Sequence, residues 1–376
     1  MTATNFEIAT EVAKAPETSA RLVSLDVFRG ATIAAMILVN NPGNGASYWP
    51  LQHAKWNGWT PTDLIFPFFL FIVGVSLVLS FRSRLRRGDS TRSLLWHTLK
   101  RSLTIFAIGV LLNGLPSFHL ATWRIPGVLQ RIALAYFAAA IITLCCRTYA
   151  RALWIAALLV GYWLLMRYVP VPGYGVPARD IPFLDPNANL AAYLDRKLMM
   201  GHLWEGTRDP EGVLSTLPAI ATTLCGVLTG EWLGSNRSPT QKMASMLAVG
   251  AAGLIAGEVW SVWFPINKNL WTSSYVLFTA GCALLCLAIC YWIIDIHQHR
   301  GWWTKPFVIF GTNAIAAYVL SELVGVPFRW QDYIFQHCFA HGFSPPVASL
   351  LYSLTIVGVC FLPIWWMYRR RIFLKV

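Results

Sequence analysis

Three polar residues near the start of the chain carry the side chains of an acid–base centre, namely Asn40, His53 and Asp63. Histidine takes up and releases protons near neutral pH, and a carboxylate can fix its tautomer through a hydrogen bond. An amide can donate to an oxygen that gains negative charge during a reaction. These residue types are able to carry out proton-transfer chemistry, but their spacing alone does not assign it to them. A second interpretation stays open for Asp63, because a carboxylate in the first turn of a helix also serves as a cap.

Five further polar residues lie within or beside long apolar stretches, namely Arg124, Arg131, Asn267, Asn269 and Glu322. Polar side chains are costly inside a lipid bilayer and usually have a function there. We expect these five to line a polar cavity and to contact a substrate. The alternative is that they only join helices through hydrogen bonds. A polar cavity would suit a transporter as well as an enzyme.

The composition is that of a membrane protein, since 56% of the 376 residues are hydrophobic and only 12% are charged. Ordinary soluble domains carry roughly a quarter charged residues, so a soluble fold is excluded. Apolar runs long enough to cross a bilayer predict an all-α polytopic membrane protein with about ten transmembrane helices. The predicted spans are 22–41, 62–81, 100–118, 125–146, 150–169, 213–233, 243–264, 272–294, 305–325 and 346–368.

The formal net charge of +13 indicates how the chain is oriented in the bilayer. Twenty of the thirty Lys and Arg residues fall on one side of the predicted spans if the N-terminus is cytoplasmic. Basic residues accumulate on the cytoplasmic side of membrane proteins and attract anionic lipid. We therefore expect both termini to be cytoplasmic, the bilayer to be the partner of the positive charge, and nucleic acid not to be a partner.

The predicted spans leave few segments outside the membrane. Residues 1–20 form a polar tail that lacks the basic start of a secretory signal. The rest, 21–376, is expected to be a single transmembrane domain. Its one long external loop is 168–212, which contains a predicted helix over 190–200. A second external stretch, 327–345, predicts a short amphipathic helix at the interface.

The cysteines and histidines do not form a recognisable metal-binding or disulfide pattern. Seven of the eight cysteines fall within apolar spans or at their ends, where free Cys packs as a small hydrophobe. His337 and His341 are four residues apart but lack the Glu of a zincin motif. We expect neither a disulfide framework nor a metal site.

Several motifs resemble those of a known family. They are Ser24–Gly30, the Val-Asn at the end of the first span, the run His53–Pro67, Arg124–Arg131, Asp209–Leu214, Asn267–Trp271 and Arg371–Lys375. In this order they resemble the heparan-α-glucosaminide N-acetyltransferase family and its bacterial homologues, within the wider transmembrane acyltransferase superfamily. The resemblance runs from about Arg21 to Val376.

The resemblance implies an enzyme that takes acetyl from cytoplasmic acetyl-CoA and delivers it to the amine of a glucosamine-type sugar on the other side of the membrane. It implies that His53 is the catalytic histidine and that Asn40 lies beside the acetyl group. Asp63 could hold the imidazole tautomer. The phosphates of CoA favour arginines near the cytoplasmic ends of spans, so we expect Arg21, Arg29 or Arg101 to bind them.

Other interpretations remain open at this stage. The chain could be an amino-sugar transporter, or an acyltransferase that modifies a hydroxyl of a cell-envelope glycan. His53 could act as a general base, or could itself be acetylated before the sugar arrives. The short tail and the absence of an organelle-targeting signal favour the cytoplasmic membrane of a bacterium. The resemblance also makes a homodimer the expected oligomeric state.

Overall fold

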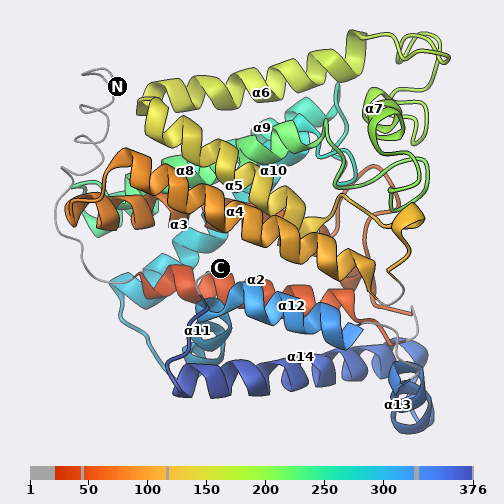
Figure 1. Ribbon diagram of the computed structural model, residues 1–376. Helices are drawn as coiled ribbons and strands as arrows, with labels where there is room; N and C mark the ends of the chain where they lie inside the picture. The colour runs from red at the N-terminus through yellow and green to blue at the C-terminus, as the bar shows by residue number, and fades with distance from the viewer. Residues whose placement is uncertain (1–21, 44–45, 116–117, 326–329, 375–376) are drawn as a thin grey trace. The chain divides into compact units, whose positions relative to one another are not determined.

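The computed structural model describes residues 22–43, 46–115, 118–325 and 330–374, which are helical except for connecting loops and two isolated β-bridges (Figure 1). The helices are α2 (Val23–Asn40), η1 (Trp49–Leu51), η2 (Pro61–Leu64), α3 (Ile65–Arg86), α4 (Thr91–Gly114), η3 (Leu120–Thr122), α5 (Val128–Cys145), α6 (Thr148–Tyr168), α7 (Leu190–Met199), α8 (Thr216–Leu233), α9 (Pro239–Ser261), α10 (Ser273–Tyr291), η4 (Trp292–Ile296), α11 (Thr304–Thr312), α12 (Ala314–Gly325), α13 (Trp330–Cys338) and α14 (Pro345–Arg369).

The all-α polytopic class predicted from the sequence is confirmed. Within the described residues, eight helices are long and apolar enough to cross a membrane, or nine if α11 and α12 together make one bent span. Each of the ten predicted spans coincides with helix in the structure. The predicted span that is not among these nine corresponds to α8, an 18-residue helix.

The chain forms two compact units, and each is described separately. The central unit comprises residues 70–285, and the terminal unit comprises the described residues of 20–69 and 286–376. The chain passes from one unit to the other within α3 and again within α10. The prediction of a single transmembrane domain stays a prediction.

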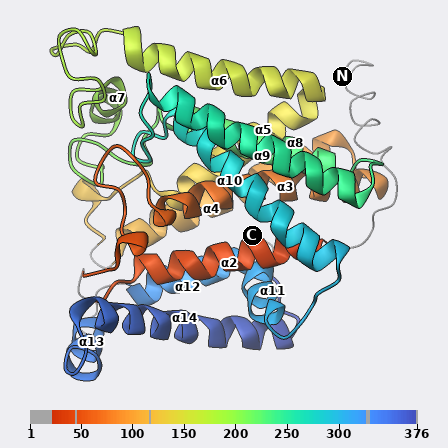
Figure 2. The same ribbon diagram turned by 180° about the vertical axis from the view of Figure 1, so that it is seen from behind.

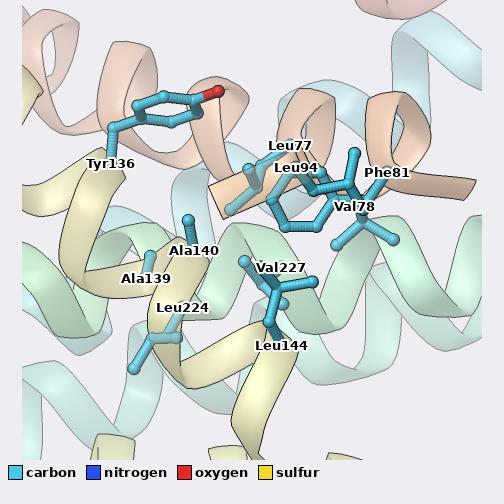
Figure 3. Close-up of a cluster of buried hydrophobic side chains, with 10 residues drawn as sticks. All are labelled: Leu77, Val78, Phe81, Leu94, Tyr136, Ala139, Ala140, Leu144, Leu224 and Val227. Atoms are coloured by element: carbon cyan, nitrogen blue, oxygen red, sulfur yellow. The ribbon is translucent and has the colours of Figure 1, made fainter. Parts of the chain in front are cut away.

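In the central unit, α5 lies between α4 and α8, and α6 packs against α8 (Figure 1). Their shared core is a cluster of buried apolar side chains, drawn in Figure 3. The cluster consists of Leu77, Val78 and Phe81 from α3, Leu94 from α4, Tyr136, Ala139, Ala140 and Leu144 from α5, and Leu224 and Val227 from α8. Small alanines on α5 let this helix approach its neighbours closely.

Two glycines bring α3 and α8 into backbone contact in the same unit. A Cβ on Gly74 would overlap the carbonyl oxygen of Thr223, and a Cβ on Gly226 would overlap that of Phe71. Helices can cross this closely only where neither carries a side chain at the crossing. The two glycines thus fix the position of α8 against the apolar half of α3.

In the terminal unit, α2 packs against α11, α12 and α14 (Figure 2). A Cβ on Gly30 would overlap the carbonyl oxygen of Phe307, and one on Gly311 would overlap that of Asp26. The Ser24–Gly30 motif therefore docks α11 onto α2, backbone against backbone.

The predicted span 305–325 consists of two helices in the structure, because α11 and α12 meet at an angle of 87°. The break is at Asn313, which is buried. Asn313 Nδ2 donates to the carbonyl of Ile372 at 3.0 Å, and Asn313 Oδ1 accepts from Leu374 N at 2.9 Å. Its amide thus binds the C-terminal segment of the chain. Asparagine readily makes such side-chain to backbone bonds in place of continuing a helix.

Two predicted elements outside the spans are confirmed. The helix expected over 190–200 is α7, whose N-terminus is capped by Asn189, with Oδ1 accepting from Ala192 N at 2.9 Å. A short helix expected within 327–345 is α13. The cytoplasmic location of the two termini stays a prediction.

Candidate active site

A histidine–aspartate pair forms between the loop after η1 and the start of the second span, in the terminal unit. His53 Nδ1 lies 2.7 Å from Asp63 Oδ1. The Asp63 side chain is only 1% exposed, whereas the His53 side chain is 51% exposed. The pair thus joins a buried carboxylate to an imidazole that is open to its surroundings.

Asp63 caps the second span as well as holding His53. Its Oδ2 accepts backbone N–H groups of Ala54 at 3.0 Å and Thr60 at 3.1 Å. The Thr60 amide is at the N-cap of η2, so this carboxylate satisfies a donor that the helix leaves unpaired. The two interpretations of Asp63, cap or partner of His53, are therefore both correct.

The segment that carries His53 is fastened to η2 on one side of the histidine. Thr60 Oγ1 donates to Gln52 O at 2.6 Å, and Thr62 Oγ1 donates to Pro50 O at 2.9 Å. These bonds hold the backbone before His53 while Asp63 holds the backbone after it. The imidazole is consequently positioned by a rigid loop and not only by its own hydrogen bond.

The Asp63 contact decides which nitrogen of His53 carries the proton. A carboxylate oxygen can only accept, so His53 Nδ1 carries the proton and donates to Asp63. The lone pair of neutral His53 is then on Nε2, on the far side of the exposed ring. This is the arrangement of a general base oriented by a buried acid.

Two neighbouring asparagines end the first span, and they differ in burial and in hydrogen bonding. Asn41 is buried, donates from Nδ2 to Ile37 O at 2.8 Å and accepts Ser353 Oγ at its carbonyl, also at 2.8 Å. Asn40, the last residue of α2, is exposed. The amide of Asn40 is therefore the one that can donate to a substrate, while the amide of Asn41 terminates the helix.

Arg124 belongs to an ion-pair group in the central unit. Its Nε and Nη2 donate to the two oxygens of Asp209 at 2.9 and 2.7 Å, and Nη2 also contacts Glu211 at 2.5 Å. The guanidinium lies over the Trp204 ring, 4.9 Å from its centroid. Burial disfavours the charge of Arg124, but the bonds to Asp209 and the charge of Glu211 outweigh burial and raise its pKa. Arg124 thus ties the 168–212 loop to the segment before α5.

Asp195 on α7 completes the attachment of this loop. Its Oδ1 accepts from Val213 N at 2.9 Å, close to the start of α8. Burial raises the pKa of the Asp195 carboxyl to about 6, and the negative charge of Asp209 adds to this effect. Asp195 is a residue that the motif analysis did not select, because its partner is a backbone amide 18 positions away in the sequence.

Arg131, one helical turn into α5, is buried beside the same loop and is 1% exposed. Its Nη2 donates to Ser215 Oγ at 2.5 Å and to Gly212 O at 3.2 Å. The guanidinium lies 5.1 Å from the centroid of the Trp271 ring. Arg131 therefore connects α5, the start of α8 and the turn before α10.

The Asn267–Trp271 motif forms that turn. Asn267 is buried, and its Oδ1 accepts from Leu270 N at 2.9 Å. Trp271 has φ = 51° and donates from Nε1 to Thr222 Oγ1 at 3.1 Å. Asn269 is half-buried in the same turn. Asn267 therefore stabilises the turn that carries Trp271, the ring against which Arg131 packs. Direct substrate contact by Asn267 and Asn269 stays a prediction.

The remaining predicted site residues lie in several places. Arg29 Nη1 is 3.2 Å from both Asp26 Oδ1 and Gly311 O, so it joins α2 to α11. Arg101 in α4 lies 5.2 Å from the centroid of the Tyr136 ring. Glu322 is half-buried on α12. Arg21 lies outside the described residues.

Comparison with known proteins places the chain among relatives. Residues 21–259 match the family described as "Heparan-alpha-glucosaminide N-acetyltransferase, catalytic". The chain is 33% identical to heparan-alpha-glucosaminide N-acetyltransferase of Homo sapiens over 412 residues, which cover 95% of this chain and 60% of the human protein. The corresponding protein of Mus musculus is 32% identical over 417 residues, with the same coverage. The chain thus spans about 60% of the length of these relatives.

Proposed function

The chain belongs to the heparan-alpha-glucosaminide N-acetyltransferase family, whose members use acetyl-CoA, and we propose that it transfers acetyl from cytoplasmic acetyl-CoA to the amine of a glucosamine-type sugar on the opposite side of the membrane. The human and mouse relatives carry the name of an amino-sugar N-acetyltransferase. Their match over 95% of this chain supports the same reaction class here. The amine acceptor, the bacterial cytoplasmic membrane and a homodimer are part of this proposal.

The observation that carries the proposal is the contact between His53 and Asp63. The 2.7 Å distance orients the imidazole, and the His53 side chain is 51% exposed, which supports an approach of the acceptor amine to this ring. Some proton-coupled transporters also use histidines and carboxylates, but a simple binding protein does not require such a pair. General acid–base catalysis does need one, and contributes about 10²–10⁴-fold in rate.

In the proposed reaction, His53 Nε2 takes a proton from the acceptor amine while the amine nitrogen bonds to the acetyl carbonyl carbon. Asn40 Nδ2 donates to the carbonyl oxygen as negative charge develops on it. The carbonyl double bond then re-forms, the C–S bond breaks with its electron pair going to sulfur, and the thiolate of CoA takes the proton from the His53 imidazolium. Asp63 stabilises the imidazolium that His53 becomes between these steps.

The predicted contacts to the CoA phosphates remain part of the proposal. Arg29 has part of its hydrogen-bonding capacity committed to Asp26 and Gly311, and Arg101 lies against Tyr136. Each carries a guanidinium, the group that binds phosphate through paired hydrogen bonds. Arg21 completes this set.

The test of the proposal is acetyl transfer by His53→Ala. Purified protein in detergent is incubated with radiolabelled acetyl-CoA and glucosamine, and labelled N-acetylglucosamine is counted. We expect the variant to lose about 10²–10⁴-fold in kcat with an unchanged melting temperature, because the side chain is half exposed. His119→Ala removes another exposed histidine and is the matched control. Near-normal transfer by His53→Ala, with acetyl-CoA still bound, would exclude the base assignment.

The same assay separates the remaining alternatives. Labelled acetyl-CoA without acceptor leaves no acetyl group on the protein if transfer is direct, whereas acetylated His53 would establish a two-step reaction. Glucosamine, glucosamine-terminated oligosaccharides and peptidoglycan fragments assayed side by side identify the acceptor. Labelling of a hydroxyl instead of an amine would replace the proposed reaction by O-acylation.

A further inference from the structure

The last described residues of the chain, 370–374, return to α11 in the terminal unit. They overlap the motif Arg371–Lys375, which takes no part in the proposed reaction. α11 itself packs against both α2 and α14 (Figure 2). The segment after α14 is therefore bonded to a helix that α14 already touches.

A reverse turn at Arg371 directs the chain back. Arg371 N donates to Tyr368 O at 3.1 Å, and Ile372 N donates to Met367 O at 2.9 Å. This pair of bonds ends many helices, with a residue in the left-handed conformation between the two donors and the helix. Arg371 has that conformation, with φ = 57°. The Phe373 ring then packs edge-on against Tyr368, with 6.2 Å between the centroids.

The left-handed position of this turn favours glycine, yet arginine occupies it. A Cβ in this conformation lies close to the following carbonyl, a cost that glycine avoids. The Arg371 side chain is exposed, and its guanidinium makes no hydrogen bond or ion pair with any residue that the structure describes between 22 and 374. The fold thus uses the backbone of Arg371 and leaves the guanidinium for a ligand.

Asn313 fixes where the segment after Arg371 lies. Its buried amide donates to Ile372 O at 3.0 Å and accepts from Leu374 N at 2.9 Å. The side chains of Ile372 and Leu374 are 38% and 52% exposed. Hydrogen bonds from one asparagine, more than burial of side chains, therefore hold this segment in place.

The same end of α11 binds Arg29, one of the residues proposed to contact the CoA phosphates. Arg29 Nη1 donates to Gly311 O at 3.2 Å, two positions before Asn313. The backbones of α2 and α11 touch here, since a Cβ on Gly311 would overlap Asp26 O. Arg29 and the segment that begins at Arg371 are thus both hydrogen-bonded to residues 311–313.

The charges around this end of α11 are mainly positive. Three consecutive arginines, 369–371, follow one another at the end of α14. The acids bonded to α2 are already paired, Asp26 with Arg29 at 3.2 Å and Asp295 with Arg300 at 3.1 Å. Five arginines against two acids favour an anionic ligand.

We propose that Arg371 binds a phosphate of acetyl-CoA and that Asn313 is the residue that positions it. This inference rests on the proposed function, because the acetyl donor supplies the phosphate. A guanidinium forms paired, charge-assisted hydrogen bonds with phosphate oxygens. The bonds of Asn313 keep the chain after Arg371 beside the turn that holds Arg29, so both arginines serve one donor molecule.

The first test is the KM for acetyl-CoA of Arg371→Gly. Glycine suits the left-handed turn, so the variant should fold as the wild type does. We expect KM to rise about tenfold or more with kcat little changed, because a hydrogen bond to a charged group is lost in donor binding. Arg370→Gln removes the neighbouring exposed cation and is the matched control, with a KM near that of the wild type. An unchanged KM in Arg371→Gly, or an equal rise in Arg370→Gln, would overturn the proposal.

The positioning role of Asn313 is tested by a double-mutant cycle. Asn313→Ala should also raise the KM for acetyl-CoA, because both bonds to the segment after Arg371 are lost. Adding Arg371→Gly to Asn313→Ala should raise KM little further, since both changes act on one phosphate contact. Effects that multiply would show that Asn313 acts independently of Arg371. The result for Arg371→Gly stands even if Asn313→Ala does not fold.

A binding measurement separates this proposal from the proposed reaction. Coenzyme A is titrated against the purified full chain in a neutral detergent, and the melting temperature is recorded. We expect coenzyme A to stabilise the wild type clearly more than Arg371→Gly at the same concentration. Equal stabilisation of both would reject the role of Arg371 and leave the transfer reaction in place. A wild type that neither binds coenzyme A nor transfers acetyl would reject the proposed function, and this inference with it.

Discussion

The molecule contains two groups centred on carboxylates, and they use their charges in opposite ways. In the terminal unit, Asp63 binds His53 and leaves half of the imidazole exposed. In the central unit, Asp209 and Glu211 bind Arg124, and the Arg131 guanidinium is fully enclosed. The first group ends in a half-exposed imidazole ring, whereas the second ends in bonds between parts of the protein. Accessibility, more than polarity, thus distinguishes the candidate catalytic group from a structural one.

Substitution of Asp63 tests the first group most directly and has the largest expected effect. Asp63→Asn keeps one acceptor oxygen for the Thr60 and Ala54 amides but presents an amide to His53, so the favoured tautomer is lost. We expect kcat for acetyl transfer to fall about 10²–10⁴-fold. The kcat of the variant is compared with that of wild type between pH 6 and pH 9. An Asp63→Asn variant with a kcat close to that of the wild type would refute the role of Asp63 in holding the His53 tautomer.

Breaking the second group should affect folding instead. Arg124→Gln leaves the buried Asp209 without its partner, and loss of one member of a buried pair costs about 3–5 kcal/mol. We expect a large drop in melting temperature with little change in kcat per folded molecule. Arg179→Gln, which breaks the exposed pair with Asp180, should leave the melting temperature unchanged. If Arg124→Gln lost acetyl transfer while remaining fully folded, Arg124 would have a part in the reaction and the Arg124–Asp209 group would not be purely structural.

The two asparagines at the end of α2 repeat the comparison on neighbouring residues. Asn40→Ala should reduce kcat about 10²–10³-fold, the usual cost of losing one donor to a developing oxyanion, without loss of stability. Asn41→Ala should lower stability by about 1 kcal/mol, because its bond to Ile37 O is lost. Both variants are assayed for transfer and for thermal unfolding. The reverse pattern would assign the catalytic amide to Asn41.

Asp195 gives the smallest expected effect, a pH dependence of stability. Burial raises the pKa of this carboxyl to about 6, so the folded chain keeps a proton that the unfolded chain loses above its ordinary pKa of 3.8. The contribution to stability is therefore present at low pH and is lost as pH rises through 6. Asp195→Asn should flatten the melting temperature between about pH 4 and 6.5. Asp180→Asn, on the exposed part of the loop, should leave this slope in place, and an unchanged slope in Asp195→Asn would refute the assignment.

The candidate site was only partly predictable from the sequence. The run from His53 to Asp63 could be singled out because both residues lie on one short loop, where ten positions of chain can place them in contact. Arg124 and Asp209 are 85 positions apart, and nothing in their spacing indicates that they pair.

The fold shows the same division. Apolar runs located the helices, because a bilayer admits only segments whose backbone bonds are satisfied internally. The 87° break at Asn313 was not predictable. The Asn313 side chain bonds to the backbone of Ile372 and Leu374, which are 59 and 61 positions further along the chain.

By itself, the sequence determined the all-helical membrane class, the membership of the family and the identity of the histidine–aspartate pair. These depend on hydrophobic length and on contacts between residues close in the chain. The tertiary structure alone decided which charges remain available. Whether a charged side chain can bind a ligand depends on the hydrogen-bond partners that the folded helices place beside it. Those partners come from distant positions in the sequence.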